Sequence, residues 1–413
     1  MKISELKNKK IAILGFGIEG QATLRFLKHH FPDKEVGIVD QKDSPDYLEK
    51  LKDCDLVIKT AGIPRRLVNQ EYTTATNIFF ANTRGTIIGV TGSKGKSTTA
   101  SLIYEILKAG GLDARLVGNI GMPMLDELHA PESANRFYVA ELSSYQLEEL
   151  KYSPHISVFI NFFPDHLDYH DGLDKYWEAK KNILSRATEK DYFIFNADYG
   201  RLVRLSEETR AQAVQFTDTL PFSENAIPLL GKHNVLNVRA AVTVARLVGV
   251  SDAVIEKAVR NFKPLPHRLE NVGTFRGVTF YDDAISTTPE STIAALEALA
   301  IERGRVGTIF LGGTDRGYDF GELARVLVEK GVRHVVLFPD SGARILKALR
   351  QTSGGESIDI FQTREMRDAV AFAYQKTAPT AICLLSTASP SYSLWKNFEE
   401  KGDLFQRFVK ELG

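Results

Sequence analysis

The sequence is poor in cysteine and carries no excess of charge of either sign. Only Cys54 and Cys383 occur among its 413 residues, and their separation fits no metal-binding spacing. A disulfide-stapled secreted domain and a zinc ribbon are therefore excluded, and a reducing cytoplasm is the expected compartment. Lysine plus arginine number 52, as do aspartate plus glutamate. This balance gives no support for nucleic acid or an anionic membrane as a partner.

Long apolar runs are also missing. No stretch approaches the ~20 apolar residues that span a bilayer. The lysine-rich segment 1–10 lacks the apolar core of a secretory signal. Hydrophobic residues make up 43% of the chain and charged residues 25%, which is ordinary for a soluble enzyme. The length predicts two or three domains.

A glycine-rich stretch at 89–98, Gly-Val-Thr-Gly-Ser-Lys-Gly-Lys-Ser-Thr, is the most informative segment. An apolar run precedes it and apolar residues at helical spacing follow it. A strand, a glycine turn and a helix typically hold a polyphosphate, because backbone N–H groups and the helix dipole face its oxygens. The match to GxxxxGKS is imperfect, since Val90 replaces the first glycine. We predict that nucleotide is bound by Gly92, Ser93, Lys94, Gly95, Lys96, Ser97 and Thr98.

A second glycine pattern, Gly15-x-Gly17-x-x-Gly20, follows a short apolar strand near the start of the chain. Asp40 ends the next strand, about 20 residues further on, as in dinucleotide-binding Rossmann units. The pattern alone suggests NAD, although the same turn holds any diphosphate. An NAD-dependent oxidoreductase is therefore an alternative, but it leaves the phosphate loop at 89–98 unexplained.

Apolar strands recur along the chain, and polar residues crowd their ends. We predict an α/β fold with three modules in series: a Rossmann-like unit at 1–83, a central phosphate-loop unit with a parallel sheet at 84–263, and a second Rossmann-like unit at 264–413. Ligands in such sheets lie at the carboxyl ends of the strands. Glu141 is placed there to hold Mg2+, or is a solvated acid, and His166 is either a metal ligand or structural.

Two further features leave alternatives open. The residue pattern gives no reason to prefer Lys180 over Lys181 on their predicted helix. Asn234 and Asn237 are three residues apart, on one face of a predicted helix, where they either contact a nucleotide or cap that helix.

These motifs, in this order, resemble the Mur ligase family over nearly the whole chain. Beside the phosphate loop, the resemblance is carried by Glu141-Leu-Ser-Ser-Tyr-Gln-Leu, Asp165-His166, His233-Asn-Val-Leu-Asn237, Leu265-Pro-His-Arg268-Leu-Glu, Leu311-Gly-Gly-Thr-Asp-Arg316-Gly and Lys396-Asn-Phe398-Glu-Glu-Lys-Gly-Asp-Leu-Phe405. Within the family, members that add D-glutamate to UDP-N-acetylmuramoyl-L-alanine are the most similar. The resemblance implies this ATP-dependent step of peptidoglycan precursor synthesis, in the cytoplasm, and we expect a monomer.

The resemblance also implies a role for each matching residue. The first module would bind the UDP-sugar, the second ATP and the third the amino acid. Lys96 would contact the ATP phosphates, Ser97 and Glu141 would hold one Mg2+, and His166 with a carbamylated Lys180 would hold a second. Further nucleotide contacts would be Asn234, Asn237, Arg268 and Asp283. The implied UDP-sugar contacts are Gly15, Phe16, Gly17, Ile18, Asp40, Gln41, Thr60, Gly62, Asn82, Asn119 and Ser143. The implied amino-acid contacts are Thr287, Arg316, Ser391 and Phe398.

Two departures from the family pattern concern the amino-acid pocket. Asp282-Asp283-Ala-Ile285-Ser-Thr287 stands where the family commonly has Asn-Asp-Ser-Lys-Ala-Thr, so a positive charge is missing at Ile285. Thr387 replaces the proline of the usual Ser-Pro-Ala. The identity or handedness of the amino acid is therefore open, with L-glutamate as an alternative. A nucleotide-gated binding module without enzymatic activity is a third, more distant reading.

Overall fold

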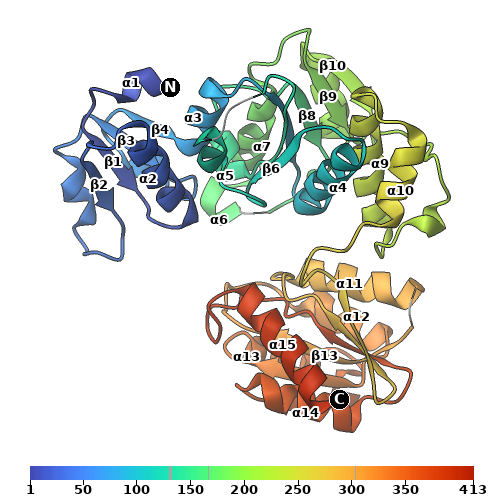
Figure 1. Cartoon of the computed structure of the whole chain (residues 1–413). Helices are drawn as coiled ribbons and strands as arrows, with labels where there is room; N and C mark the ends of the chain where they lie inside the picture. Colours follow the sequence, from blue (N-terminus) through green and yellow to red (C-terminus); the bar gives the residue numbers. More distant parts are fainter. Residues whose placement is uncertain (130–132, 166, 303) are drawn as a thin grey trace. The chain divides into compact units, whose positions relative to one another are not determined.

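The computed structural model describes residues 1–129, 133–165, 167–302 and 304–413 (Figure 1). Contacts divide the chain into two compact units, one formed by 1–226 with 235–262 and the other by 227–234 with 263–413. The described residues form three sheets, each flanked by helices, which confirms the predicted α/β class. Each sheet lies within one of the three predicted segments. The boundaries 1–83, 84–263 and 264–413 remain a prediction, because the first two segments share one compact unit.

The first sheet has four parallel strands in the order β2-β1-β3-β4. Its central strand β1 is apolar and fully buried, as expected for a strand with neighbours on both sides. Its elements are α1 (Ile3–Leu6), β1 (Ile11–Leu14), α2 (Ile18–His30), β2 (Val36–Val39), β3 (Leu56–Lys59), β4 (Tyr72–Thr74) and α3 (Ala75–Asn82).

The second sheet has six parallel strands in the order β10-β9-β8-β5-β7-β6. The strand that precedes the phosphate loop, β5, therefore lies between β7 and β8, and the loop emerges from the middle of the sheet. The strands are β5 (Thr86–Thr91), β6 (Ala114–Gly118), β7 (Phe137–Glu141), β8 (Ile156–Phe159), β9 (Tyr192–Phe195) and β10 (Gln212–Gln215). The helices are α4 (Lys96–Ala109), α5 (Ser144–Glu148), α6 (Leu167–His170), α7 (Leu173–Lys181), α8 (Gly200–Glu208), α9 (Lys232–Leu247) and α10 (Asp252–Arg260).

The third sheet has the order β11-β12-β16-β13-β14-β15, and it is parallel except for the antiparallel pair β11 and β12. Its strands are β11 (Glu270–Phe275), β12 (Val278–Asp282), β13 (Val306–Gly312), β14 (His334–Phe338), β15 (Asp359–Gln362) and β16 (Ile382–Leu385). Its helices are α11 (Pro289–Glu302), α12 (Gly321–Glu329), α13 (Gly342–Gln351), α14 (Met366–Lys376) and α15 (Phe398–Leu412). Helix α11 begins at Pro289, and proline suits the first helical position because its missing N–H would have no partner within the helix there.

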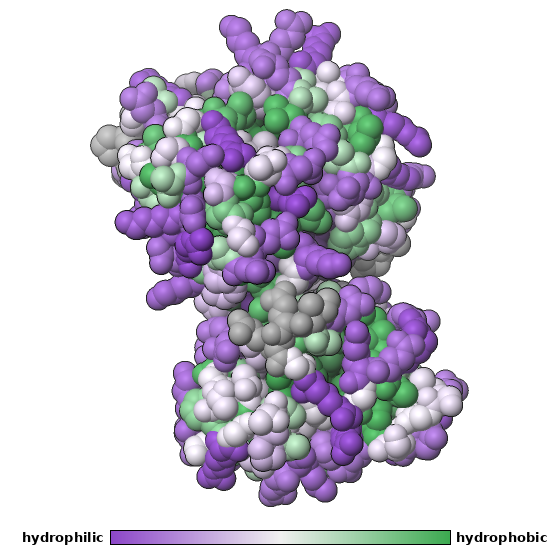
Figure 2. All heavy atoms as spheres, turned by 90° about the vertical axis from the view of Figure 1, so that its right-hand side faces the viewer, coloured by the Kyte–Doolittle hydropathy of each residue, from purple (hydrophilic) through white to green (hydrophobic). Residues whose placement is uncertain are grey.

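The surface mixes polar and apolar side chains on the face shown in Figure 2. In the described part of the chain, the exposed large apolar residues are Ile18, Ile38, Met122 and Tyr392. Ile18 lies beside a candidate site, and Tyr392 follows the predicted pocket residue Ser391. None of the described helices is both long and apolar enough to cross a membrane.

Candidate active site

The phosphate loop joins β5 to α4, as the sequence predicts. Gly95 precedes the helix in the left-handed region, with φ of 82°. A Cβ atom at this position would lie 2.5 Å from Oδ1 of Asn237, so both the backbone conformation and the packing require glycine. Asn237 on α9 also accepts a hydrogen bond of 3.2 Å from the Thr99 hydroxyl. The predicted nucleotide contact Asn237 therefore lies directly against the loop.

Asn161, just after β8, holds the loop in shape. Its Oδ1 atom accepts hydrogen bonds from the backbone N–H groups of Ser93 and Lys94, at 2.9 and 3.0 Å. The Ser93 hydroxyl donates to the carbonyl oxygen of Phe163 at 2.8 Å. The Lys96 ammonium donates to the carbonyl oxygens of Gly92 and Ser93, both at 3.1 Å. Asn161 was not among the predicted site residues, although a polar residue directly after an apolar strand is a signal for one.

The structure distinguishes Lys180 from Lys181. Lys180 is 1% exposed, and its Nζ atom lies 2.8 Å from the Gly92 carbonyl oxygen and 4.9 Å from the centroid of the Tyr176 ring. Lys181 instead pairs with the exposed Glu208 at 3.1 Å. Burial, reinforced by the nearby charge of Lys96, lowers the pKa of Lys180 well below its ordinary value. A neutral amine beneath the phosphate loop is the chemical form that reacts with CO2 to give a carbamate.

Glu141 ends β7 and pairs in register with Val90 of the neighbouring β5. It is 3% exposed, and its Oε2 atom has no hydrogen-bond partner among the described residues. A buried carboxylate oxygen without a donor suits a cation, so Glu141 fits an Mg2+ site next to the loop. Ser97 lies in the first turn of α4, and its role as a ligand of the same ion remains a prediction. The predicted ligand His166 lies outside the described residues.

The N-terminal glycine turn is tightly built. Gly15 has φ of 90°, and a Cβ atom on Gly20 would lie 2.1 Å from the Gly15 carbonyl oxygen, so α2 can approach the turn only with glycine there. Gly17 faces open space. Asp40 accepts hydrogen bonds from the backbone N–H groups of Phe16, at 2.7 Å, and Lys42, at 3.1 Å, which lower its pKa. Its carboxylate thus fastens the turn, a role that competes with the ribose contact of an NAD site.

A pocket of about 230 Å³ lies next to this turn, within the first compact unit. It contains the predicted UDP-sugar contacts Ile18 and Asn119. Its other lining residues were not predicted: Glu19, Ala75, Thr76, Gly118, Gly121, Pro123, Met124 and Gln146. Glu19 lies within the glycine pattern, and Gln146 lies in the segment after Glu141. Both could have been predicted from their position within these motifs.

The other predicted UDP-sugar contacts, Gly15, Phe16, Gly17, Asp40, Gln41, Thr60, Gly62, Asn82 and Ser143, are not among the residues that line this pocket. Two of them make hydrogen bonds within the protein. The Asn82 amide accepts from the N–H of Ile3 and donates to the carbonyl oxygens of Met1 and Ile78, which ties α1 to α3. Ser143 caps α5 in a reciprocal pair with Gln146. These bonds fix the two side chains locally, and the binding role of all nine residues remains a prediction.

In the second unit, Asp283 is the centre of a buried polar group beside Arg268. Its carboxylate accepts hydrogen bonds from the Ser386 hydroxyl at 2.8 Å and the Leu269 N–H at 3.1 Å. Burial raises the pKa of Asp283 to about 6, while the charge of Arg268 opposes that rise. On α9, the amide of Asn234 donates to the Leu230 carbonyl oxygen at 2.7 Å. The predicted nucleotide contacts Arg268 and Asp283 therefore lie in one electrostatic group.

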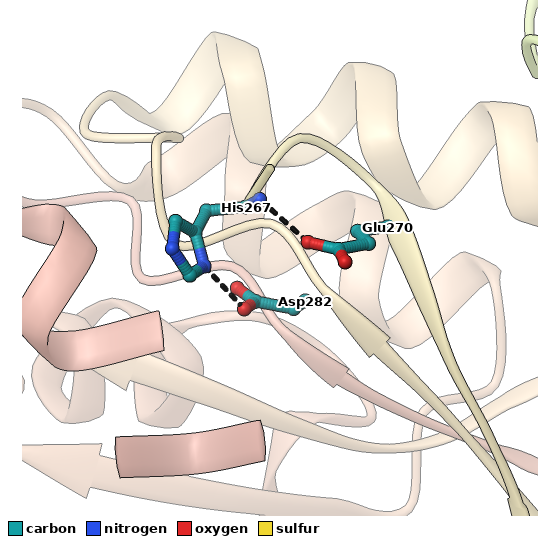
Figure 3. A group of neighbouring side chains, drawn as sticks. All are labelled: His267, Glu270 and Asp282. Atoms are coloured by element: carbon teal, nitrogen blue, oxygen red, sulfur yellow. Dashed lines mark hydrogen bonds and ion pairs between the residues drawn. The ribbon is translucent and has the colours of Figure 1, made fainter. Parts of the chain in front are cut away.

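Figure 3 shows a network next to Arg268 that sequence reasoning missed. The ring of His267 meets Asp282 with Nδ1 and Oδ2 2.7 Å apart, and its backbone N–H donates to Glu270 at 2.8 Å. Ligand atoms of these three residues lie within 4.8 Å of one another, close enough for a metal ion. However, the amide of Gln406 donates to both carboxylates, at 3.0 and 2.9 Å. These hydrogen bonds give the three side chains a structural role. They stabilise the backbone of His267, which lies in the left-handed region with φ of 58°.

The predicted amino-acid contacts come from four segments of the second unit. Arg316 is exposed and Thr287 is partly buried. Ser391 is 3% exposed, and its hydroxyl has no hydrogen-bond partner within the described ranges. Phe398 begins α15. An unpaired buried hydroxyl is consistent with a polar ligand at Ser391.

One turn further along α15 from Phe398, Lys401 is buried, and its ammonium lies 2.5 Å from the Thr387 hydroxyl. Burial lowers the pKa of Lys401 to about 7, while the charges of Asp282 and Asp283 oppose the shift. Sequence reasoning noted the charge missing at Ile285 but not this lysine, which supplies a titratable cation in the same unit.

Comparison with known proteins agrees with this arrangement. The profile of the Mur ligase middle domain matches residues 90–226, and that of the Mur ligase, glutamate ligase domain matches residues 267–389. The chain belongs to the Mur ligase family. It is 36% identical to the UDP-N-acetylmuramoylalanine--D-glutamate ligase of Geobacillus kaustophilus, over 98% of each chain. It is also 33% identical to the UDP-N-acetylmuramoyl-L-alanine--L-glutamate ligase of Salinispora tropica, over 100% of this chain and 99% of that protein.

Solved structures of Mur ligases share the fold. The UDP-N-acetylmuramate-alanine ligase MurC of Thermotoga maritima matches with a TM-score of 0.65 at 17% identity, over 98% of this chain and 100% of that one. The MurF ligase of Thermotoga maritima, solved in complex with ADP, matches with a TM-score of 0.61 at 15% identity, over 100% and 98%. At these identities the likeness shows the fold alone. The sequence-based assignment to the family is thus confirmed by relatives and by architecture.

Proposed function

We propose that this Mur ligase joins glutamate to UDP-N-acetylmuramoyl-L-alanine at the expense of ATP, as a step in peptidoglycan precursor synthesis. The observation that carries the proposal is the phosphate loop with two buried groups beside it: Lys180, whose pKa is lowered by burial and whose Nζ atom lies 2.8 Å from a loop carbonyl oxygen, and Glu141 with an unpartnered oxygen. The named relatives, at 36% and 33% identity over nearly the full length, support the substrate pair.

The chemistry follows from the poor reactivity of a carboxylate toward an amine. ATP first converts the alanyl carboxylate of the UDP-sugar into an acyl phosphate. The glutamate amine then attacks the carbonyl carbon, and the tetrahedral intermediate expels phosphate. Lys96 at the loop offsets the negative charge that develops on the transferred phosphoryl group. Bound Mg2+ ions would let the two anionic substrates approach each other.

Lys180 has a second role in the proposal. Its neutral amine would take up CO2, and the resulting carbamate would present two oxygens where the ammonium presents only donors. An ammonium repels Mg2+, whereas a carbamate is an oxygen ligand of the kind that Mg2+ prefers. With His166, the carbamate would hold one ion, while Glu141 and Ser97 would hold the other. This arrangement explains why a lysine is buried below the loop at all, since an unpaired buried ammonium is unfavourable.

D-glutamate is the proposed acceptor, and L-glutamate is the second candidate. Ile285 in place of a lysine changes the charge near the expected amino-acid pocket, and the Salinispora tropica relative is named for the L-enantiomer. The relatives thus include ligases named for D-glutamate and for L-glutamate. We further propose that the protein works as a cytoplasmic monomer, which light scattering on the purified protein tests directly.

The test of the proposed function is phosphate release from ATP and Mg2+. We expect release only when UDP-N-acetylmuramoyl-L-alanine and glutamate are both present, with the enantiomer decided by chiral analysis of the product. ATP binding without substrate-dependent turnover would instead support the non-enzymatic binding module. Quenching of NADH fluorescence on binding, without substrate-dependent phosphate release, would favour the oxidoreductase.

A further inference from the structure

Glu19 is the only ionisable side chain among the described residues that line the pocket beside the N-terminal turn. It lies in the first turn of α2. The backbone N–H of Ala61 donates a hydrogen bond to its carboxyl group, which stabilises the ionised form. Its Oε1 atom is buried and has no hydrogen-bond partner in the described part of the chain. The side chain that lines the pocket therefore carries one carboxyl oxygen without a partner, and such an oxygen suits a ligand that supplies one.

Lys59, at the end of β3, is the cation whose charge attracts Glu19, but it is paired with other groups. Lys59 is 1% exposed and forms an ion pair with Glu149 at 2.8 Å. Its ammonium also donates to the carbonyl oxygens of Ile63, at 2.6 Å, and Thr60, at 3.4 Å. One ion pair and two hydrogen bonds hold the Lys59 ammonium, and none of these contacts is to Glu19. Two buried carboxyl groups thus face one lysine, and Glu19 receives only its long-range attraction.

The acid is therefore easily protonated in the free protein. Burial raises the pKa of Glu19 to about 7, and the charge of Lys59 and the Ala61 hydrogen bond only partly oppose the rise. Asp40, the other acid at this turn, is held ionised by the N–H groups of Phe16 and Lys42. At neutral pH, Glu19 is thus divided between its ionised and neutral forms, while Asp40 is not.

A UDP-sugar would bring two phosphate charges to this turn, and here the inference rests on the proposed function. We propose that Glu19 binds the UDP-sugar in its protonated form, donating a hydrogen bond to an oxygen of the diphosphate and taking one proton from solvent when the ligand enters. An ionised carboxylate at this place would repel the diphosphate and would leave Oε1 without a donor. A neutral carboxyl group removes the repulsion and gives the phosphate oxygen a donor.

The test is the pH dependence of UDP-N-acetylmuramoyl-L-alanine binding, measured by calorimetry without ATP on the full chain. Both phosphates of this ligand are diesters, so neither titrates near neutral pH. We expect the affinity of the wild-type protein to fall up to about tenfold for each pH unit above about pH 7. Glu19→Gln, which keeps a donor but cannot ionise, should bind with an affinity that no longer depends on pH and stays near the wild-type value at low pH.

Glu127→Gln is the matched control, because Glu127 is also a buried acid whose pKa is raised by burial, but it does not line the pocket. This variant should keep the wild-type slope. A wild-type affinity that is constant with pH, or that increases as pH rises, would overturn the inference, since an increase would mean that an ionised Glu19 accepts a hydrogen bond from the ligand. The same slope in Glu19→Gln as in the wild type would also overturn it.

A second measurement needs no variant. Calorimetry in two buffers of different protonation enthalpy counts the protons exchanged on binding, and we expect net uptake that approaches one proton above about pH 7. No uptake, or release, would contradict the role of Glu19 while leaving the proposed function intact. If the wild-type protein does not bind UDP-N-acetylmuramoyl-L-alanine at any pH, the proposed function itself is wrong, and the inference about Glu19 is wrong with it.

Discussion

The two glycine turns of the first compact unit differ in the ionisable side chains beside them, which are basic at one turn and acidic at the other. The basic groups lie at the phosphate loop of 92–98: Lys96 on the loop carbonyls and Lys180 buried against the Gly92 carbonyl. At the turn of 15–20 lie acids: Asp40 on the Phe16 N–H and Glu19 in the pocket wall. In both places burial favours the neutral form, so it lowers the pKa of Lys180 and raises the pKa of Glu19. A glycine pattern therefore predicts a backbone turn that can bind a phosphate group. The buried side chains around the turn determine the charge of the site.

The largest expected effect tests the cationic turn. Lys96→Ala should abolish ligation, lowering turnover by about 10²–10³-fold or more, because the charge of the transferred phosphoryl group is no longer offset. Phosphate release at saturating ATP is the measurement, with circular dichroism to confirm folding. Lys108→Ala, in the last turn of the same helix, is the control and should remain active. Near-normal turnover in Lys96→Ala would show that Lys96 does not contribute to the reaction.

Lys180→Ala should be almost inactive and should regain part of its activity with added acetate or another short carboxylate. The cavity left by the side chain would admit the oxygen ligand that the carbamate is proposed to supply. Lys181→Ala removes a neighbouring lysine that pairs with exposed Glu208, and it should behave as wild type. Full activity of Lys180→Ala, or of the wild type in CO2-depleted buffer, would count against the modification.

An intermediate effect is expected in the second unit. Arg316 is exposed on the loop after β13, where a guanidinium can make two parallel hydrogen bonds to a carboxylate of glutamate. Losing them should cost about 2–4 kcal/mol of transition-state stabilisation. Arg316→Ala should therefore lower kcat/KM for glutamate far more than it changes the KM for ATP. Arg325→Ala, whose side chain pairs with glutamates of its own helix, is the control. Loss of ATP affinity with unchanged kinetics for glutamate would place Arg316 in the nucleotide site.

The smallest effect concerns stability at the acidic turn. The folded protein raises the pKa of Glu19 from its ordinary value of 4.5 to about 7. The unfavourable contribution is therefore absent below about pH 4.5, grows between the two values and is fully present above about pH 7. Glu19→Gln removes it, so the variant should be more stable than wild type at pH 8, by about 1–3 kcal/mol, and equally stable below about pH 4.5. Thermal unfolding at both pH values measures this, and a lower stability of the variant at pH 8 would show that Glu19 is ionised and satisfied in the fold.

The sequence was sufficient for the buried parts of the fold and for the glycine turns. Apolar strands were expected along the chain, and runs such as 11–14 and 192–195 form strands with neighbours on both sides. Edge strands were missed because their burial is one-sided or slight: β10 reads Gln-Ala-Val-Gln and is mostly exposed, and β11 contains a bulge near Gly273. Neither segment shows the periodicity by which strands are identified.

Residues of the candidate site could be predicted where a motif gives a residue type a single chemical role. They were harder to predict where burial of the side chain determines the role. Lys96 was predicted from its place in the phosphate loop and Glu141 from the end of a strand. Lys180 could not be told from Lys181 by pattern until one was found buried and the other paired on the surface. Glu19 resembles an ordinary acid in the first turn of a helix, where it complements the dipole. Only its position in a pocket wall, with a lysine that is already paired, indicates another function.

The most direct test of ATP-driven ligation follows an oxygen atom. UDP-N-acetylmuramoyl-L-alanine labelled with ¹⁸O in the alanyl carboxylate is incubated with ATP, Mg2+ and glutamate, and the released phosphate is analysed by mass spectrometry. Because the acyl phosphate joins a carboxylate oxygen to phosphorus and the amine then expels that oxygen with the phosphate, we predict one ¹⁸O atom in each phosphate released. Phosphate that is released in the complete reaction but carries no ¹⁸O would mean that water, not the carboxylate, attacks ATP, and would contradict the proposed mechanism.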